Sequence, residues 1–211
     1  MMIILSFMAL ITGGLEIRAT YKGLQDQVYF FKPFTTYLML LIALQTQEPP
    51  TTFYKYAIAA GLLFSIAGDI LLMMPDDRFI EGLVSFLTAH LCYIVAFSVG
   101  IRFGTAWVGL LILGTYGAVV YSLLAPRLGK MKVPVIIYLL IILIMAWRAT
   151  GRWVETGTQG ALLALAGAAL FVISDSALAF RRFKGRYRTA DLLVMSTYYA
   201  AQWLIALSVS G

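Results

Sequence analysis

The feature that most constrains this chain is a series of apolar runs, each about 20 residues long. Eight such runs follow one another, at roughly 1–17, 30–47, 55–74, 79–100, 104–124, 132–150, 158–180 and 190–210. A helix of about 20 apolar residues crosses the hydrocarbon core of a bilayer, so each run is long enough to span a membrane. The sequence therefore predicts an all-α polytopic integral membrane protein, a bundle of about eight transmembrane helices.

The composition excludes the common soluble classes. Of the 211 residues, 61% are hydrophobic and only 12% are charged, which is too little charge to cover a soluble core of this size. The runs are continuous rather than alternating, which excludes a transmembrane barrel. The first run lacks a basic start and a small-x-small cleavage site, so it is interpreted as a helix. Because the loops between the runs are short, we expect a single transmembrane domain over residues 1–211.

The distribution of basic residues predicts the topology. Twelve of the 16 Lys and Arg residues fall in the loops that follow the first, third, fifth and seventh runs. The positive-inside rule places these loops in the cytoplasm, so both termini are expected on the non-cytoplasmic side of a bacterial inner membrane or its equivalent. The basic segment 181–188 abuts a span on each side, so we interpret the net charge of +6 as a topology signal. No nucleic-acid partner is expected.

Two carboxylates stand out because they lie within apolar runs. An acidic side chain in lipid costs about 3 kcal/mol or more, so Asp69 and Asp175 are candidates for a functional site. Helical spacing puts Asp69 on one face with Gly61 and Ser65, and Asp175 follows a similar small-residue face. Both are expected to point into the bundle near its cytoplasmic end. Alternatively, each aspartate pairs with a basic residue to fasten two helices. The other acids, Glu16 among them, are assigned to loops or helix ends.

The basic and imidazole side chains leave alternatives open. His90, the single histidine, is either an acid, base or hydrogen-bond donor, or a satisfied core residue. A metal site is not expected, because His90 and Cys92 are single and point to different sides of a helix. Lys32 is either a snorkelling anchor or a phosphate contact, and Pro33 is expected in the first turn of its helix.

Further polar side chains lie inside the runs. Tyrosine hydroxyls and an amide in lipid need hydrogen-bond partners, so they should share the interior with the aspartates. This group consists of Tyr138, Tyr198, Tyr199 and Gln202. Trp147 and Arg148 are interpreted as belt and anchor residues at the opposite interface.

Several motifs occur in a recognisable order along the chain. Gly68-Asp69 precedes the block GLVSFLTAHLCY at 82–93, Lys32-Pro33 comes earlier, and MAWRA, FVISDS and YYAAQ follow at 145–149, 171–176 and 198–202. This pattern resembles the YhhN-like family of eight-span membrane proteins, which includes the lysoplasmalogenases. The resemblance implies a hydrolase that cleaves the vinyl-ether bond of a lysoplasmalogen to a fatty aldehyde and glycerophospho-choline or -ethanolamine. The partners are then a lysophospholipid and the bilayer, with no cofactor; headgroup preference, chain length and oligomeric state stay open.

The residues fit that chemistry. Vinyl-ether hydrolysis protonates a carbon and passes through an oxocarbenium ion, so two carboxyls can divide the work, as in glycoside hydrolysis. Asp69, Asp175 and His90 are therefore the candidate catalytic residues, and which aspartate is the acid stays open. The candidate substrate-binding residues are Lys32 for the phosphate, and Tyr93, Tyr138, Ser174, Tyr198, Tyr199 and Gln202.

A small-molecule or proton-coupled transporter is the main alternative, because intramembrane carboxylates and a histidine suit it equally well. Transport sites usually lie near the midplane of the membrane. Both aspartates are expected toward the cytoplasmic leaflet, which favours a lipid substrate.

Overall fold

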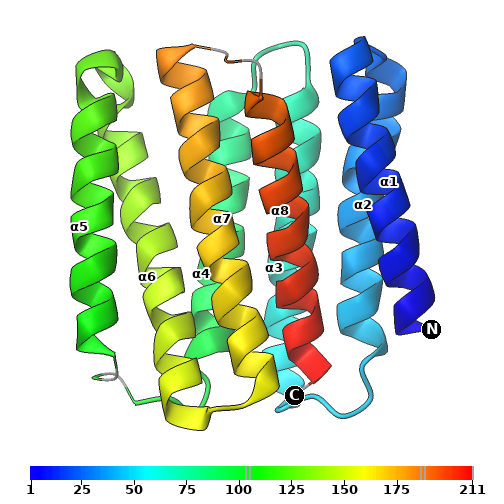
Figure 1. The fold of residues 1–211 in the computed structure, drawn as a ribbon, viewed down its shortest axis with the longest axis vertical. Coiled ribbons are helices and arrows are strands. Elements are labelled where there is room, and N and C mark those ends of the chain that lie inside the picture. Colours follow the sequence, from blue (N-terminus) through cyan, green and yellow to red (C-terminus); the bar gives the residue numbers. More distant parts are fainter. Residues whose placement is uncertain (103, 105, 186, 188, 211) are drawn as a thin grey trace.

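The computed structural model describes residues 1–102, 104, 106–185, 187 and 189–210. Within this part of the chain, eight long helices follow one another, joined by short connections (Figure 1). They are α1 (Met2–Lys22), α2 (Gln25–Gln45), α3 (Thr52–Met73), α4 (Phe79–Ser98), α5 (Trp107–Leu124), α6 (Lys132–Thr156), α7 (Gln159–Lys184) and α8 (Ala190–Leu207). All eight are long and apolar enough to cross a membrane, so the chain is an integral membrane protein, as the sequence predicts.

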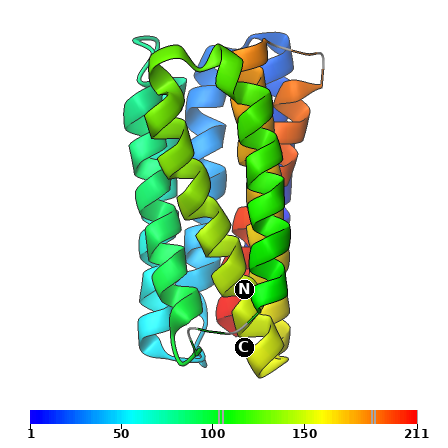
Figure 2. The ribbon, with the colours of Figure 1, turned by 90° about the vertical axis from the view of Figure 1, so that its left-hand side faces the viewer.

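The helices pack as an up-and-down bundle whose inner ring holds the candidate site. Helices α2, α3, α4, α6, α7 and α8 form this ring through contacts between neighbours, with α8 closing it against α2. Helix α1 packs outside the ring against α2 and α8, and α5 packs outside it against α6 and α7 (Figures 1 and 2). The two outer helices therefore lie at opposite edges of the bundle.

Glycines on the inner faces let neighbouring helices approach closely, as small residues commonly do in membrane bundles. A Cβ atom on Gly61 of α3 would lie 2.2 Å from the Tyr93 ring of α4. A Cβ atom on Gly167 of α7 would lie 2.9 Å from the backbone oxygen of Ala201 in α8. The small-residue faces thus direct α3 and α7, which carry Asp69 and Asp175, into the bundle.

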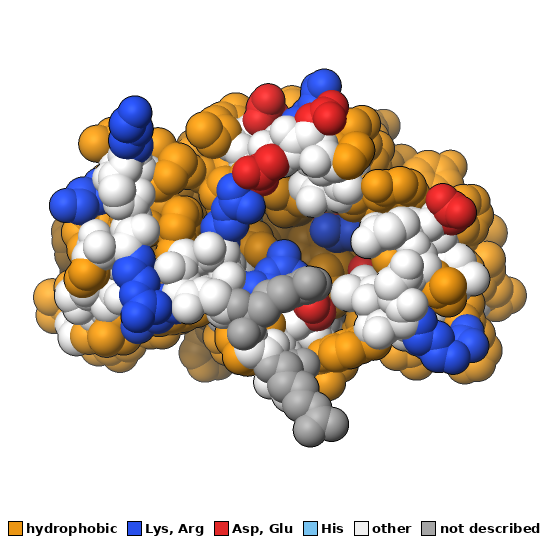
Figure 3. Space-filling view, turned by 90° about the horizontal axis from the view of Figure 1, so that it is seen from above, with side chains coloured by type: hydrophobic (Ala, Val, Ile, Leu, Met, Phe, Trp, Pro, Cys, Tyr) orange, Lys and Arg blue, Asp and Glu red, His pale blue; other side chains and the backbone are white. Residues whose placement is uncertain are grey.

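The connections after α1, α3, α5 and α7 gather at one end of the bundle, uppermost in Figure 1. We call this the basic end, because it carries residues 23–24, 74–78, 125–131, 185, 187 and 189, with the described basic side chains on and beside them. Figure 3 looks onto this end and shows Lys and Arg side chains around a central hollow. Two of the basic residues counted in the topology prediction, at positions 186 and 188, lie outside the described residues.

The first two helices are longer at the basic end than the apolar runs suggest. Helix α1 continues to Lys22 and ends at Gly23, whose φ of 69° lets its N–H reach the carbonyls of Ala19 and Thr20. Helix α2 then begins at Gln25, so Pro33 lies well inside it rather than in its first turn. The expected position of Pro33 is therefore wrong; the helix accommodates a proline that cannot donate a hydrogen bond.

Trp147 and Arg148 are buried rather than placed at the lipid interface. Arg148 is 3% exposed and donates to Ser98 Oγ (2.9 Å) and to the carbonyls of Ile101 (3.3 Å) and Arg102 (3.2 Å). Trp147 is 6% exposed and donates to the carbonyl of Ala106. The expected anchor role is wrong. Arg148 instead ties α6 to the last residue of α4 and to the connection that follows it, where it satisfies two backbone carbonyls.

Candidate active site

Asp69 lies about one turn before the end of α3, and its side chain is 1% exposed. Its Oδ2 accepts hydrogen bonds from Thr36 Oγ1 and Tyr198 Oη, each at 2.7 Å. Lys32 Nζ lies 3.7 Å from Oδ1. A buried carboxylate is costly unless it is paired and hydrogen-bonded. Helices α2 and α8 supply the ammonium group and the hydroxyl donors that meet this need at Asp69.

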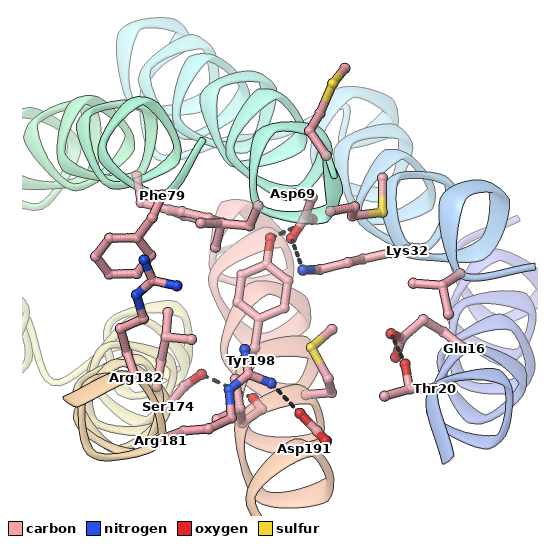
Figure 4. A pocket seen from close by; sticks show the side chains of 18 of the residues that line it. Glu16, Thr20, Lys32, Asp69, Phe79, Ser174, Arg181, Arg182, Asp191 and Tyr198 are labelled. Carbon is pink, nitrogen blue, oxygen red and sulfur yellow. Dashed lines mark hydrogen bonds and ion pairs between the residues drawn. The ribbon is translucent and has the colours of Figure 1, made fainter. Parts of the chain in front are cut away.

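Lys32 reaches inward from α2 toward Asp69, as Figure 4 shows, and its side chain is 13% exposed. It therefore lines the interior and does not snorkel to the lipid surface. The ion pair joins α2 to α3, which is the fastening role that the sequence leaves open for a buried aspartate. Because Lys32 also borders a cavity, the same ammonium group is in place to meet an anion there.

Two further candidate residues extend the Asp69 cluster across the bundle. Tyr93 Oη donates to Gln202 Oε1 at 2.7 Å, and Gln202 Nε2 lies 3.4 Å from Tyr198 Oη. Tyr93 and Gln202 are fully buried, so they reach the cavity only through Tyr198. Tyr93 and Gln202 are thus placed to orient Tyr198 and do not themselves border the space for a ligand.

Asp175 has a separate set of partners, on α4 and α6. Its Oδ2 accepts a short hydrogen bond from Tyr138 Oη and lies 3.2 Å from His90 Nε2, which is itself 3.0 Å from Tyr138 Oη. His90 is fully buried, with its ring edge-to-face against Phe171 at 4.6 Å, whereas the Asp175 side chain is 12% exposed. The histidine and tyrosine thus hold Asp175 from behind and leave part of its carboxyl open.

Aromatic rings separate the two clusters. Phe86 packs on Tyr198 with ring centroids 5.8 Å apart, and Phe171 packs on Tyr198 at 5.6 Å. Among the described residues no hydrogen bond joins Asp69 to Asp175. The two carboxyls nevertheless border one cavity, so a single ligand bound there can approach both.

This polar cavity opens at the basic end and has a volume of about 480 Å³. Asp69, Lys32 and Tyr198 line one part of its wall, and Ser174 another (Figure 4). Asp175 also lines the cavity. Pockets for small molecules commonly have volumes of about 300–1,000 Å³. The cavity is therefore large enough for the polar part of a lipid.

Ion pairs surround the mouth of the polar cavity. Arg181 forms a short contact with Asp191, and Arg182 Nη2 lies 2.7 Å from Asp77 Oδ2. The hydrogen bond from Arg182 lowers the pKa of the exposed Asp77 carboxyl below its usual value. Arg182 also lies over the Phe79 ring at 4.6 Å. Both arginines are thus held at the rim, where they can attract an anion.

A second, apolar cavity of about 40 Å³ adjoins the first, between α4, α6 and α7. Its lining is almost entirely hydrophobic and includes Leu83, Val135 and Phe183. Asp175 lines both cavities. The carboxyl of Asp175 therefore lies where a polar chamber meets an apolar one.

Two residues predicted to contact the substrate do not offer a free hydroxyl to the polar cavity. Ser174 borders the polar cavity, but its Oγ donates to the Val194 carbonyl at 2.9 Å, which ties α7 to α8. Tyr199 is buried on the α1 side of α8, and its Oη makes no hydrogen bond of standard geometry with the described residues. Tyr199 is absent from the lining of the polar cavity, so it lies behind the wall.

Glu16 is a further acidic residue inside the bundle, which the sequence analysis assigned to a loop or helix end. It lies inside α1, is 1% exposed, and lines the polar cavity. Its Oε1 accepts a hydrogen bond from Thr20 at 2.9 Å. The assignment is wrong because α1 extends past the apolar run. The spacing of Thr12, Glu16 and Thr20, four residues apart, marks a polar stripe that could have revealed it.

Comparisons with known proteins agree with the fold and the motifs. The model of the YhhN family matches residues 27–209. "Uncharacterized membrane protein YhhN" from Escherichia coli O6:H1 is 30% identical over 205 residues, which cover 97% of this chain and 98% of that protein. No solved structure matches the chain.

Relatives with a named activity are also similar. Human "Lysoplasmalogenase TMEM86B" is 37% identical over 164 residues, covering 75% of this chain and 66% of that protein. Bovine "Lysoplasmalogenase TMEM86A" is 36% identical over 165 residues, covering 72% of this chain and 64% of that protein. The family match covers most of the eight-helix bundle, including both aspartates, and the chain therefore belongs to the YhhN family.

Proposed function

We propose that the chain hydrolyses the vinyl-ether bond of a lysoplasmalogen, releasing a fatty aldehyde and a glycerophospho-alcohol. The relatives whose names state an activity are lysoplasmalogenases, which supports a hydrolase rather than the transporter that the sequence leaves open. The observation that carries the proposal is the position of Asp175 on the wall shared by the polar and the apolar cavity.

The two cavities match the two parts of such a lipid. The glycerophosphate and headgroup occupy the polar cavity, where Lys32 and the rim arginines 181 and 182 meet the phosphate. The first carbons of the hydrocarbon chain enter the small apolar cavity between α4, α6 and α7, and the rest of the chain extends from there toward the lipid. In a lysoplasmalogen the vinyl ether is the link between these parts, so it lies at the junction, beside Asp175.

Asp175 is accordingly the proposed general acid. Its carboxyl gives a proton to the β-carbon of the vinyl ether, and the carbon attached to oxygen becomes an oxocarbenium ion. The Asp175 carboxylate then takes a proton from water as that water adds to the cation, which gives a hemiacetal and restores the acid. The hemiacetal breaks its carbon–oxygen bond to the glycerol, the hydroxyl proton passes to the glycerol oxygen, and aldehyde and alcohol leave.

Asp69 has a different task, because Lys32, Thr36 and Tyr198 hold it as a carboxylate. A fixed negative charge in a low-dielectric cavity stabilises the developing cation without reorganising during the reaction. His90 and Tyr138 fix the orientation of Asp175 and relay its proton. The carboxyls thus divide the two roles without touching each other.

Aldehyde release by purified, detergent-solubilised protein tests the proposal. The substrate is 1-alkenyl lysophosphatidylethanolamine, with the 1-acyl analogue run in parallel. Aldehyde should appear from the alkenyl lipid alone, and Asp175→Asn should lower kcat by a factor of about 10²–10⁴, the usual contribution of a general acid. Asp76→Asn, which removes an exposed carboxyl from the α3–α4 connection, is the matched control and should retain wild-type turnover.

Two results would contradict the proposal. One is folded wild-type protein that releases no aldehyde from any alkenyl lysolipid. The other is wild-type turnover by both Asp69→Asn and Asp175→Asn in their folded forms, because neither carboxyl would then take part in the reaction.

A further inference from the structure

Glu16 occupies an unusual position among the acidic side chains of the polar cavity. Five acids line it, and four of them lie within 4.0 Å of a basic or imidazole nitrogen: Asp69, Asp77, Asp175 and Asp191. Glu16 has no such partner among the described residues. Its Oε2 is buried and makes no hydrogen bond of standard geometry in that part of the chain. A buried carboxylate without a cation is costly, so its presence in a ligand cavity requires an explanation.

The local charge balance favours a cation as the missing partner. Lys32, the nearest basic group from α2, is already paired with Asp69 at 3.7 Å. Lys32 therefore has to serve two carboxylates, and the group formed by Glu16, Lys32 and Asp69 carries a net charge of about −1 when all three are ionised. Thr20 donates to Oε1 and fixes the carboxyl group. The hydroxyl of Tyr199 lies near the same carboxyl group, but Oε2 has no hydrogen bond of standard geometry within the described part of the chain and can accept one from a further donor.

The position of Glu16 in the cavity indicates what that cation is. Figure 4 shows Glu16 and Thr20 across the cavity from Arg182, with Lys32 between Glu16 and Asp69. Cationic groups thus stand at the rim and beside Asp69, and a carboxylate stands at the α1 side. A zwitterion that carries a phosphate and an ammonium group matches this arrangement, with the phosphate on Lys32 and the rim arginines and the ammonium on Glu16.

We propose that Glu16 is the recognition site for the positively charged amine of the lipid headgroup and sets the preference for amine-bearing over amine-free lysophospholipids. The inference rests on the proposed function for its substrate, but binding of an uncleavable lipid tests it independently of catalysis. Ethanolamine, whose ammonium group can donate hydrogen bonds, fits Oε2 better than choline, which has no N–H.

The test compares two substrates that differ in the amine. Glu16→Gln keeps the shape of the side chain and removes its charge. It should raise KM for 1-alkenyl lysophosphatidylethanolamine about tenfold, with kcat little changed, because a charge-assisted hydrogen bond is lost from binding. For 1-alkenyl lysophosphatidate, which lacks the amine, KM should stay the same or fall, because Lys32 is then shared with one carboxylate fewer. Glu81→Gln, at an exposed position in the first turn of α4, is the matched control.

Binding of the uncleavable 1-alkyl analogues, measured by calorimetry in detergent, gives the same comparison without turnover. Loss of affinity for the ethanolamine lipid alone supports the inference, even when no alkenyl lipid is hydrolysed. An equal loss for both lipids indicates a structural role for Glu16 and overturns the inference, as does unchanged binding of both.

A second variant covers the case in which Glu16→Gln fails to fold. Thr20→Val removes the hydroxyl that orients Glu16 but keeps its charge. It should weaken discrimination between the two lipids by a smaller factor, about twofold to fivefold, since one neutral hydrogen bond contributes about 0.5–1.5 kcal/mol. Unchanged discrimination by folded Thr20→Val, together with equal wild-type affinity for the two lipids, would overturn the inference.

Discussion

Removal of Lys32 and removal of Asp69 should destabilise the fold by different amounts, because the two side chains of this ion pair are not equally buried. Asp69 is 1% exposed and the Lys32 side chain is 13% exposed. Lys32→Met removes the cation and leaves a carboxylate inside the bundle with only the hydroxyls of Thr36 and Tyr198. Asp69→Asn leaves a lysine that can still reach water in the polar cavity. The first substitution should therefore destabilise the fold more than the second.

The expected loss in free energy of unfolding depends on which charged group each variant leaves without a partner. Breaking a buried ion pair by removing one member costs about 3–5 kcal/mol, so we expect about 3 kcal/mol for Lys32→Met. For Asp69→Asn we expect about 1–2 kcal/mol, because the remaining lysine is partly hydrated. The double variant leaves no unpaired charge and should lose about 2 kcal/mol, which gives a coupling of about 2–3 kcal/mol.

Thermal unfolding of the purified protein in detergent measures these differences. For a chain of this size 1 kcal/mol corresponds to about 2–4 °C in Tm, so Lys32→Met should lower Tm by about 6–12 °C. Lys130→Met, which removes an exposed lysine from the α5–α6 connection, is the control and should stay within about 0.5 kcal/mol of wild type. Additive losses in the double variant, or a larger loss for Asp69→Asn than for Lys32→Met, would refute the reasoning.

Three further outcomes follow from local geometry. Gly167→Ala places a Cβ against the α8 backbone and should lower the free energy of unfolding by about 1–3 kcal/mol, measured by thermal unfolding. Gly114→Ala, where the added Cβ meets open space, should stabilise the fold by about 0.5–1 kcal/mol. Equal effects of the two substitutions would contradict the close packing at Gly167. Arg148→Met removes the donor that joins α6 to Ser98 and to the carbonyls of the α4–α5 connection, and it should cost about 2–3 kcal/mol by the same assay. An unchanged Tm would argue against this stabilising role. Because Arg182 lowers the pKa of Asp77, their pairing stabilises the fold at neutral pH, and this stabilisation is lost as pH falls through the lowered pKa. NMR titration should show a higher Asp77 pKa in Arg182→Gln than in the wild type. An unchanged pKa would exclude the hydrogen bond as the cause of the shift.

The span pattern and the inward faces could be predicted because both depend on short-range periodicity. The eight apolar runs correspond to the eight helices, and the small residues around Asp69 and Asp175 do face inward. Such predictions need only the length of a bilayer and the spacing of a helix.

The positions of Glu16 and Lys32 could not be predicted from hydropathy. Both lie where α1 and α2 pass the polar cavity, so the helices continue although the residues there are polar. An average over a window of residues counts polarity but not direction, and it ends a span where the polar face begins. The separation of the two aspartates into distinct clusters depends on Phe86, Phe171 and Tyr198, which come from three helices and meet only in the folded bundle.

The polar cavity opens at the basic end of the bundle, and this has a consequence for traffic across the membrane. Under the proposed function, a lysolipid whose headgroup enters by that mouth comes from the leaflet on the same side. Lipid in the opposite leaflet would have to cross the bilayer before it could be hydrolysed. The two products of the proposed reaction would then leave by different routes. The glycerophospho-alcohol would return through the mouth to water, and the aldehyde would pass from the apolar cavity between α4, α6 and α7 into the hydrocarbon phase.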